Sequence, residues 1–283
     1  MIYDRKEKCV KDPGEYRQGL ASFMYETVVG RILLRVAVSP WVSKLWGVYQ
    51  SSRLSRRSIR PFVEKNGVQV TEEQLKSFRS FNDFFTRKKE VVAQQEEPEV
   101  LLSPADSKMS YFPITEGLQL KIKSSTYELE EVLQDPALAQ AYRGGTCIIF
   151  RLAVDDYHRY HFIDDGRLLS TKKIKGQLHT VRSISEKYRV FARNSRQVSV
   201  LDTDHFGKVV QVEVGAILVG KIQNHNKESF TRLEEKGYFE FGGSTILMLL
   251  SGDIQFDPDI AENNAEGNEI QVRAGERIGI LKK

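Results

Sequence analysis

A serine that follows two glycines and opens an apolar run is the first candidate for chemistry in this chain. Ser244 and its neighbour Gly243 come just before residues 246–250, which read Ile-Leu-Met-Leu-Leu. A hydroxyl placed directly after a glycine can attack the carbonyl of its own preceding peptide bond, because glycine leaves room and tolerates a strained backbone. The same pattern is also typical of an ordinary turn, so the assignment depends on other reactive groups.

An acid and a base that could serve this serine stand earlier in the sequence. Asp106 ends the run Ser-Pro-Ala-Asp, and His161 ends the run DDYHRYH at 155–161. Asp106, His161 and Ser244 then form a set in which the carboxylate orients the imidazole and the imidazole takes the serine proton. The alternative for Asp106 is a turn cap, which is common for aspartate after Ser-Pro.

The histidine segment also allows a metal site. His158 and His161 lie three residues apart beside Asp155 and Asp156. His-x-x-His beside carboxylates occurs in metal sites, but no further Cys or His stands at a typical spacing, so we expect no metal. Lys108 and Arg159 are candidates for phosphate contacts or for solvated surface charges, and three histidines have no assigned role: His179, His205 and His225.

Taken together, these motifs resemble those of the phosphatidylserine decarboxylase proenzymes, which are self-processing, pyruvoyl-dependent enzymes of phospholipid synthesis. The resemblance covers roughly residue 81 to the C-terminus, and its motifs occur in the same order as in the family. The motifs are FNDFFTR at 81–87, SPAD at 103–106, DYHR at 156–159 with His161, VGA at 214–216 with VG at 219–220, and KGYF at 236–239 running into GST at 243–245.

The resemblance implies that the chain cuts itself. Ser244 would attack the carbonyl of Gly243, with His161 as base and Asp106 as its orienting acid. The products would be chains 1–243 and 244–283, held together as a heterodimer, with a covalent pyruvoyl group derived from Ser244 at the start of the short chain.

The resemblance also implies the reaction that follows. The pyruvoyl group would form a Schiff base with the amine of phosphatidylserine in a membrane, release carbon dioxide and yield phosphatidylethanolamine. The first histidine of the family motif is the expected proton donor to the α-carbon, which is His158 here. The departures from the usual pattern remove no reacting group, although they bear on loop geometry and processing rate: Gly242, Ser107, Val154 and Ile163.

Two parts of the chain must position these residues. Residues 1–95 indicate helices, because the apolar stretch 20–49 is interrupted by charges and split by Pro40 into two amphipathic segments. A helix ended by Pro61 would carry four arginines on one face, and Thr71 would cap a further helix reaching residue 87. These arginines are Arg53, Arg56, Arg57 and Arg60.

Residues 96–283 have a different character, because strand-like runs dominate after the polar linker 94–98. The runs lie at 148–152, 198–201, 209–214 and 246–250, with a hairpin connection at 204–207 and one helix at 127–142. The predicted fold is α+β, with an N-terminal helical membrane-associating region followed by a mainly antiparallel β catalytic core.

The N-terminal region favours contact with an anionic membrane surface. Trp41, Trp46 and Tyr49 suit the headgroup level, and the arginine face suits anionic lipid. An ordinary helical subdomain is the alternative, and a net charge of +4 gives little support for nucleic acid as a partner. With no secretory signal, no run long enough to span a bilayer and two cysteines, we expect a peripheral protein on the cytoplasmic face of the cell membrane.

Three other functions stay open at the level of sequence. A serine hydrolase could use the same three residues without cutting itself, although Ser244 is not in a Gly-x-Ser-x-Gly elbow. A non-catalytic relative could bind lipid through residues 20–60. A related pyruvoyl enzyme could act on a soluble amino acid, and neither the acyl-chain preference nor the oligomeric state follows from the residues.

Overall fold

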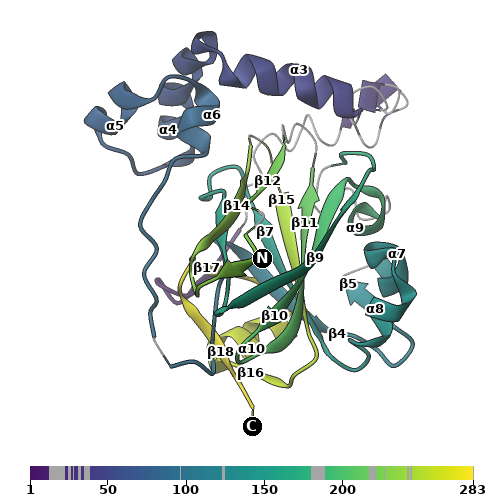
Figure 1. Ribbon diagram of the computed structural model, residues 1–283. Helices are drawn as coiled ribbons and strands as arrows, with labels where there is room; N and C mark the ends of the chain where they lie inside the picture. The colour runs from purple at the N-terminus through teal and green to yellow at the C-terminus, as the bar shows by residue number, and fades with distance from the viewer. Residues whose placement is uncertain are drawn as a thin grey trace.

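A ten-stranded sheet forms the body of the computed structural model (Figure 1). The structure describes residues 1–12, 23–24, 27, 29–30, 33–34, 39–95, 97–122, 125–179, 189–216, 221–225, 227–240, 242 and 244–282. Neighbouring strands run antiparallel except β1 and β17, which run parallel. In order across the sheet, the strands are β13 (Ser229–Phe230), β9 (Gly166–Ile174), β10 (Arg196–Thr203), β11 (Gly207–Gly215), β15 (Ser244–Leu250), β7 (Thr146–Leu152), β4 (Ser107–Pro113), β17 (Glu269–Val272), β1 (Ile2–Asp4) and β2 (Cys9–Lys11).

The large sheet is covered on both faces, which explains why its central strand is apolar at nearly every position. Along β15, Ile246 and Met248 belong to one hydrophobic core, whereas Leu247 and Leu249 belong to the other. Successive side chains of a strand point to opposite faces, so a strand buried on both sides needs a continuous apolar run.

Two layers complete these cores. On one face lie short helices and a hairpin, which are α7 (Leu129–Leu133), α8 (Pro136–Gln140), α9 (Val190–Arg193), β5 (Gln119–Ile122) and β6 (Ser125–Glu128). The other face carries α10 (Pro258–Ala265) and two small sheets. Their orders are β12 (Ile222–Asn224), β14 (Glu235–Phe239) and β8 (Arg159–His161), and β16 (Ile254–Phe256), β18 (Arg277–Leu281) and β3 (Val100–Leu102).

The N-terminal helices gather at one end of the molecule (Figure 1). They have a core of their own, in which Phe62 meets Phe81 and Phe84 edge to face at ring distances of 5.1 and 5.9 Å. Val154 packs against this core and so joins the helices to the β-rich part. The elements are α3 (Pro40–Ser51), the 3-10 helix η1 (Arg53–Ser58), α4 (Ile59–Asn66), α5 (Glu72–Ser77) and α6 (Phe81–Phe85).

The predicted class is confirmed at the level of a mixed α and β protein with mostly antiparallel sheets, but the predicted helices are broken differently. Pro61 lies in the first turn of α4 rather than after a helix. The backbone N–H groups of the first turn have no partner within the helix, so the N–H that proline lacks is not missed there. The arginines at 53–60 are therefore divided between η1 and α4 instead of lining one helix face. The helix predicted before Pro40 lies mostly outside the described residues.

Local capping explains the other differences. Thr71 caps α5 through a capping box with Gln74, as predicted, but Ser80 caps a second helix, α6, within the stretch expected to be one. The helix predicted at 127–142 is split because Gln134 has a φ of 51° and Asp135 caps α8. Among the residues that the structure describes, no helix has the length and apolar character needed to cross a bilayer.

Candidate active site

Ser244 is the first residue of β15 and is completely buried. It pairs with Gly215 of β11 on one side and with Leu152 of β7 on the other, so the sheet fixes its backbone. Gly243 lies outside the described residues, as does the 219–220 part of the VGA motif. Gly242 has a φ of 140°, a conformation that favours glycine. Glycine at this position, one of the four departures from the usual sequence pattern, therefore suits the local backbone.

His158 is the histidine that contacts this serine. Its Nδ1 lies 3.4 Å from Ser244 Oγ, and its Nε2 lies 2.8 Å from the carbonyl oxygen of Ala153. A carbonyl oxygen only accepts hydrogen bonds, so Nε2 carries the proton and Nδ1 presents its lone pair to the serine hydroxyl. Phe85 stacks on the imidazole at 4.1 Å, and burial lowers the pKa of His158 to about 3, which keeps the ring neutral.

A buried ion pair holds the carbonyl that orients His158. The Lys108 ammonium lies 2.8 Å from both carboxylate oxygens of Asp156, and Asp156 accepts a 2.7 Å hydrogen bond from the backbone N–H of Ala153. These contacts fix the turn that leads into His158. The carboxylate of Asp156 is thus occupied by its ion pair with Lys108. In the described ranges, no group of three or more His, Cys, Asp or Glu residues is arranged to hold a metal ion.

His161 lies in the same neighbourhood but makes different contacts. Its Nδ1 lies 3.2 Å from the carbonyl oxygen of Pro104, to which its backbone N–H also donates at 3.0 Å. Burial lowers the pKa of His161, while the charge of Asp106 acts in the opposite direction. The contacts of the described residues join His161 neither to Ser244 nor directly to Asp106.

Asp106 is anchored rather than free. Its carboxylate pairs with Lys89 at 2.5 Å and accepts a 2.9 Å hydrogen bond from the backbone N–H of Ala274. Lys89 also lies over the ring of Tyr157, which stacks parallel to His161 at a centroid distance of 6.4 Å. Asp106 and His161 therefore belong to one cluster beside the Ser244–His158 pair, linked through Lys89 and Tyr157.

Sequence reasoning missed the residues that orient the reactive groups. Phe85 belongs to the FNDFFTR motif, but nothing in the sequence indicates that it stacks on His158. Lys108 and Arg159, considered for phosphate contacts, pair instead with Asp156 and Glu235. Lys108 and Asp156 are 48 residues apart in the sequence, so only the fold brings them together.

The remaining histidines make contacts of their own. The ring of His179 lies 3.0 Å from Gln177 Oε1, and Asn194 holds its backbone from both sides. His205 and His225 pair with carboxylates at 2.9 and 2.8 Å, and these partners are Asp164 and Glu235.

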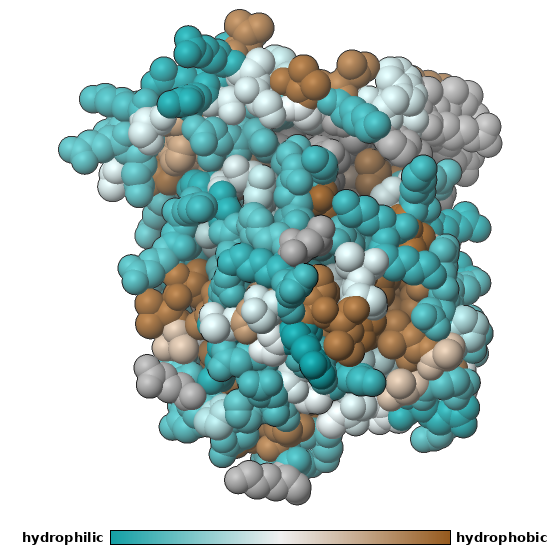
Figure 2. All heavy atoms as spheres, viewed as in Figure 1, coloured by the Kyte–Doolittle hydropathy of each residue, from teal (hydrophilic) through white to brown (hydrophobic). Residues whose placement is uncertain are grey.

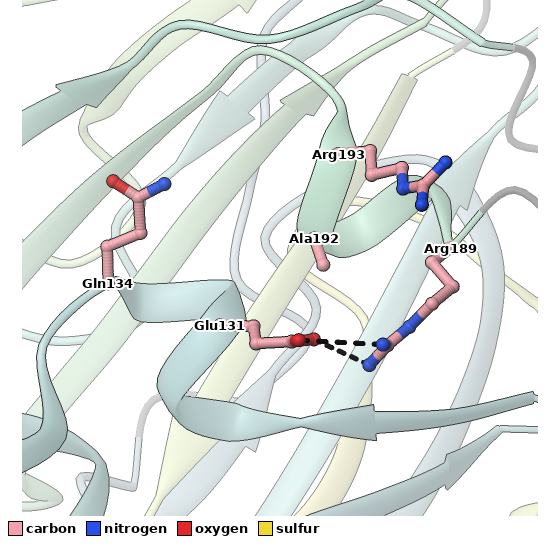
Figure 3. Close-up of a pocket in the computed structure, with 5 residues that line it drawn as sticks. All are labelled: Glu131, Gln134, Arg189, Ala192 and Arg193. Atoms are coloured by element: carbon pink, nitrogen blue, oxygen red, sulfur yellow. Dashed lines mark hydrogen bonds and ion pairs between the residues drawn. The ribbon is translucent and has the colours of Figure 1, made fainter.

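A pocket of about 370 Å³ lies elsewhere, between α7 and α9 (Figure 3). Arg189 points across it to Glu131, with which it forms an ion pair of 2.5 Å. Its lining includes none of the reactive residues above, and it is formed by Glu131, Gln134, Arg189, Ala192 and Arg193.

Comparison with known proteins identifies relatives over nearly the whole chain. A family model described as phosphatidylserine decarboxylase matches residues 81–280. Phosphatidylserine decarboxylase proenzyme 2 of Clostridium acetobutylicum is 44% identical over 98% of this chain and 97% of the relative. Phosphatidylserine decarboxylase proenzymes of Desulfitobacterium hafniense and Ruminiclostridium cellulolyticum are 38% and 40% identical, each over 99% of this chain and over 98% and 97% of the relative.

Proposed function

The chain belongs to the phosphatidylserine decarboxylase family, and from this we propose that it processes itself and then converts phosphatidylserine into phosphatidylethanolamine and carbon dioxide. The observation that carries the proposal is the buried Ser244 hydroxyl facing the bare Nδ1 of a neutral histidine. Gly242, one residue before the Gly243–Ser244 bond, has a φ of 140°, which glycine adopts without steric cost.

Processing begins when Ser244 Oγ attacks the carbonyl carbon of Gly243 and a base takes the hydroxyl proton. The amide becomes an ester, and the amino group of residue 244 is freed. Loss of the α-proton then expels the Gly243 carboxylate and leaves a dehydroalanine at 244. Its enamine tautomerises to an imine, which water hydrolyses with loss of ammonia to give the pyruvoyl group.

The two histidines have separate proposed roles. His161 is the base for processing, as the family motif implies. Burial lowers its pKa, and the negative charge of Asp106 opposes that shift. The Nδ1 of His161 donates to the carbonyl oxygen of Pro104, which leaves Nε2 as its basic nitrogen. Among the contacts of the described residues, however, it is His158 that meets the serine. Exchange of one histidine at a time therefore distinguishes the two bases directly.

His158 is the proposed proton carrier in the decarboxylation. A pyruvoyl group at 244 supplies a carbonyl that condenses with the substrate amine and accepts the electron pair left by carbon dioxide. The bare Nδ1 of His158 can take a proton from the substrate ammonium and return it to the α-carbon. Phe85 covers the ring and helps to exclude water.

The short chain produced by cleavage would remain bound to the long one. Residues 244–282 contribute β15 between β11 and β7, and β17 between β4 and β1. Cutting the chain before Ser244 leaves both strands hydrogen-bonded within the large sheet. A heterodimer of chains 1–243 and 244–283 is the expected product.

The N-terminal helices are the proposed membrane contact. Trp41, Leu45 and Val48 are 57, 63 and 71% exposed and recur at i, i+4 and i+7, which places them on one face of α3. Figure 2 shows apolar side chains protruding among polar ones at the end of the molecule where α3 lies. The helices within residues 1–95 would thus hold the catalytic part, 96–283 together with β1 and β2 of its large sheet, on the cytoplasmic face of the membrane.

The test is release of labelled carbon dioxide from phosphatidylserine carrying the label in its serine carboxyl group. The parent protein should release it and Ser244→Ala should release none. His161→Ala should stay uncut and inactive, whereas His158→Ala should be cut but inactive. Cleavage in His161→Ala together with an uncut His158→Ala would transfer the processing role to His158, and release by Ser244→Ala would refute the function.

A further inference from the structure

Besides the exposed Lys88, the segments around His158 carry four cationic side chains, and most of their charge is compensated. Three of these cations have a carboxylate oxygen within 2.8 Å. The pairs are Lys89–Asp106, Lys108–Asp156 and Arg159–Glu235. The fourth cation is Arg87.

Arg87 differs because no carboxylate in the described part of the chain forms an ion pair with it. Its guanidinium donates one long hydrogen bond, 3.3 Å, to the carbonyl oxygen of Phe84, and lies 4.9 Å from the centre of the Phe84 ring. Burial lowers the pKa of Arg87, so the loss of hydration outweighs the attraction of nearby anionic groups. A half-buried guanidinium without a counter-ion is costly unless an anion joins it.

The position of Arg87 places this charge at the edge of the Ser244 site. It follows Phe85 by two residues, and Phe85 stacks directly on His158. Arg159 donates hydrogen bonds to the carbonyl oxygens of Thr86 and Arg87, at 2.8 and 3.3 Å, which hold this backbone in place. The charge of Arg87 also contributes to the lowered pKa of His158, after burial.

We infer that Arg87 binds the phosphodiester of phosphatidylserine while the serine part of the headgroup reaches residue 244. The inference rests on the proposed function and adds a substrate-binding residue to it. A guanidinium matches a phosphate through two parallel hydrogen bonds, which suits an arginine whose side chain donates a single hydrogen bond to the described residues.

The chemistry of the substrate selects the phosphate over the carboxylate. The carboxylate loses its charge as it leaves as carbon dioxide, so a cation bound to it would stabilise the starting state more than the transition state. The phosphodiester keeps its charge throughout the reaction. A contact with the phosphodiester lowers the free energies of the bound substrate and of the transition state alike. Loss of this contact should therefore raise KM and leave kcat nearly unchanged.

Two variants and one control test this inference. Arg87→Met removes the charge, Arg87→Lys keeps it without the fork of donors, and Lys88→Met removes the neighbouring exposed charge as a matched control. Each is purified, its processing is checked by mass, and its kinetics are measured with water-soluble dihexanoyl phosphatidylserine. Binding of glycerophosphoethanolamine, which has the phosphodiester but no carboxylate, is measured by titration calorimetry.

Arg87→Met should be processed normally, because self-cleavage involves no phosphate. Its KM for the substrate and its Kd for glycerophosphoethanolamine should both rise at least about tenfold, the loss expected for a charged hydrogen-bonded contact, while kcat changes less than about threefold. Arg87→Lys should recover part of the affinity, and Lys88→Met should match the parent protein.

Two results would overturn the inference. An unchanged KM in processed Arg87→Met and Arg87→Lys would remove Arg87 from substrate binding. A raised KM with unchanged Kd for glycerophosphoethanolamine would assign Arg87 to the carboxylate instead. Failure of the proposed function would look different, because the parent protein would release no carbon dioxide, whereas the calorimetric comparison needs no turnover.

Discussion

At the scale of the residue, the two ring nitrogens of His158 have opposite environments. Nε2 faces the carbonyl of Ala153, and Nδ1 faces the hydroxyl of Ser244. The sequence predicted the reactive residue types and their order, because each chemistry requires particular side chains. It could not predict which histidine meets the serine, since the turn held by Asp156 and Lys108 decides this through contacts distant in sequence.

Burial of neutral His158 makes stability depend on pH. Its pKa is lowered from 6.5 to about 3, so the unfolded chain binds a proton below pH 6.5 that the native protein does not. The free energy of unfolding should therefore fall with acidification between these values, by about 1.4 kcal/mol for each pH unit from this residue. Urea unfolding of Ser244→Ala at pH 6.5 and pH 5 measures the slope, with and without His158→Gln.

His158→Gln should remove roughly 2 kcal/mol of the loss in unfolding free energy between pH 6.5 and pH 5. His161 and His179 remain in both proteins, so the difference isolates His158. Equal losses with and without His158→Gln would show that this histidine is not buried in its neutral form.

At the scale of the element, the sequence predicted strands better than helices. The apolar runs at 148–152, 209–214 and 246–250 all lie within observed strands, because burial on both faces leaves a continuous signal. The helix expected at 127–142 is two helices, because Gln134 adopts a left-handed conformation and Asp135 begins a new cap. Such breaks depend on one or two residues and leave the periodicity almost unchanged.

A buried ion pair joins the large sheet to the small sheet that carries His161. Lys236 of β14 and Glu213 of β11 lie 2.7 Å apart and are almost completely buried. Asn224 bonds Glu213 and also accepts from the Tyr160 hydroxyl, which extends the polar contact to β8. This network ties the histidine strand to the strand that pairs with Ser244.

Removal of one partner should leave the other charge buried and unpaired. In the uncut Ser244→Ala protein, Lys236→Met should lower the free energy of unfolding by about 3 to 5 kcal/mol. Adding Glu213→Leu should restore part of that loss, because no buried charge then remains. Urea denaturation of the three proteins provides the comparison, and a single-substitution cost below about 1 kcal/mol would contradict the buried pair.

At the scale of the whole molecule, helices and sheets divide the proposed work between membrane contact and chemistry. The sequence indicated this division through composition, since the apolar helical stretch precedes the strand-rich part. It could not indicate how the parts meet, which depends on α6 packing Phe85 onto His158 and on Val154 joining the phenylalanine cluster. The site is therefore assembled from both parts.

The exposed face of α3 provides a test of the membrane contact. Trp41→Ser combined with Leu45→Ser removes two large exposed apolar side chains from one helix face. Affinity for anionic vesicles should fall at least about tenfold, because each side chain contributes roughly 1.5 to 3 kcal/mol when buried in apolar surroundings. Co-sedimentation measures the change, and Val92→Ser, at a residue 71% exposed outside the helices, is the matched control. Equal loss in both proteins would remove α3 from the membrane surface.

The most direct test of the whole account is the intact mass of the purified protein under denaturing conditions. Self-processing predicts two chains, 1–243 and 244–283, with the short chain lighter by one ammonia than a chain beginning with serine. Ser244→Ala should give one uncut chain. A single full-length chain from the parent protein, stable during incubation with anionic vesicles and labelled by an active-site serine reagent, would contradict self-processing and favour a serine hydrolase.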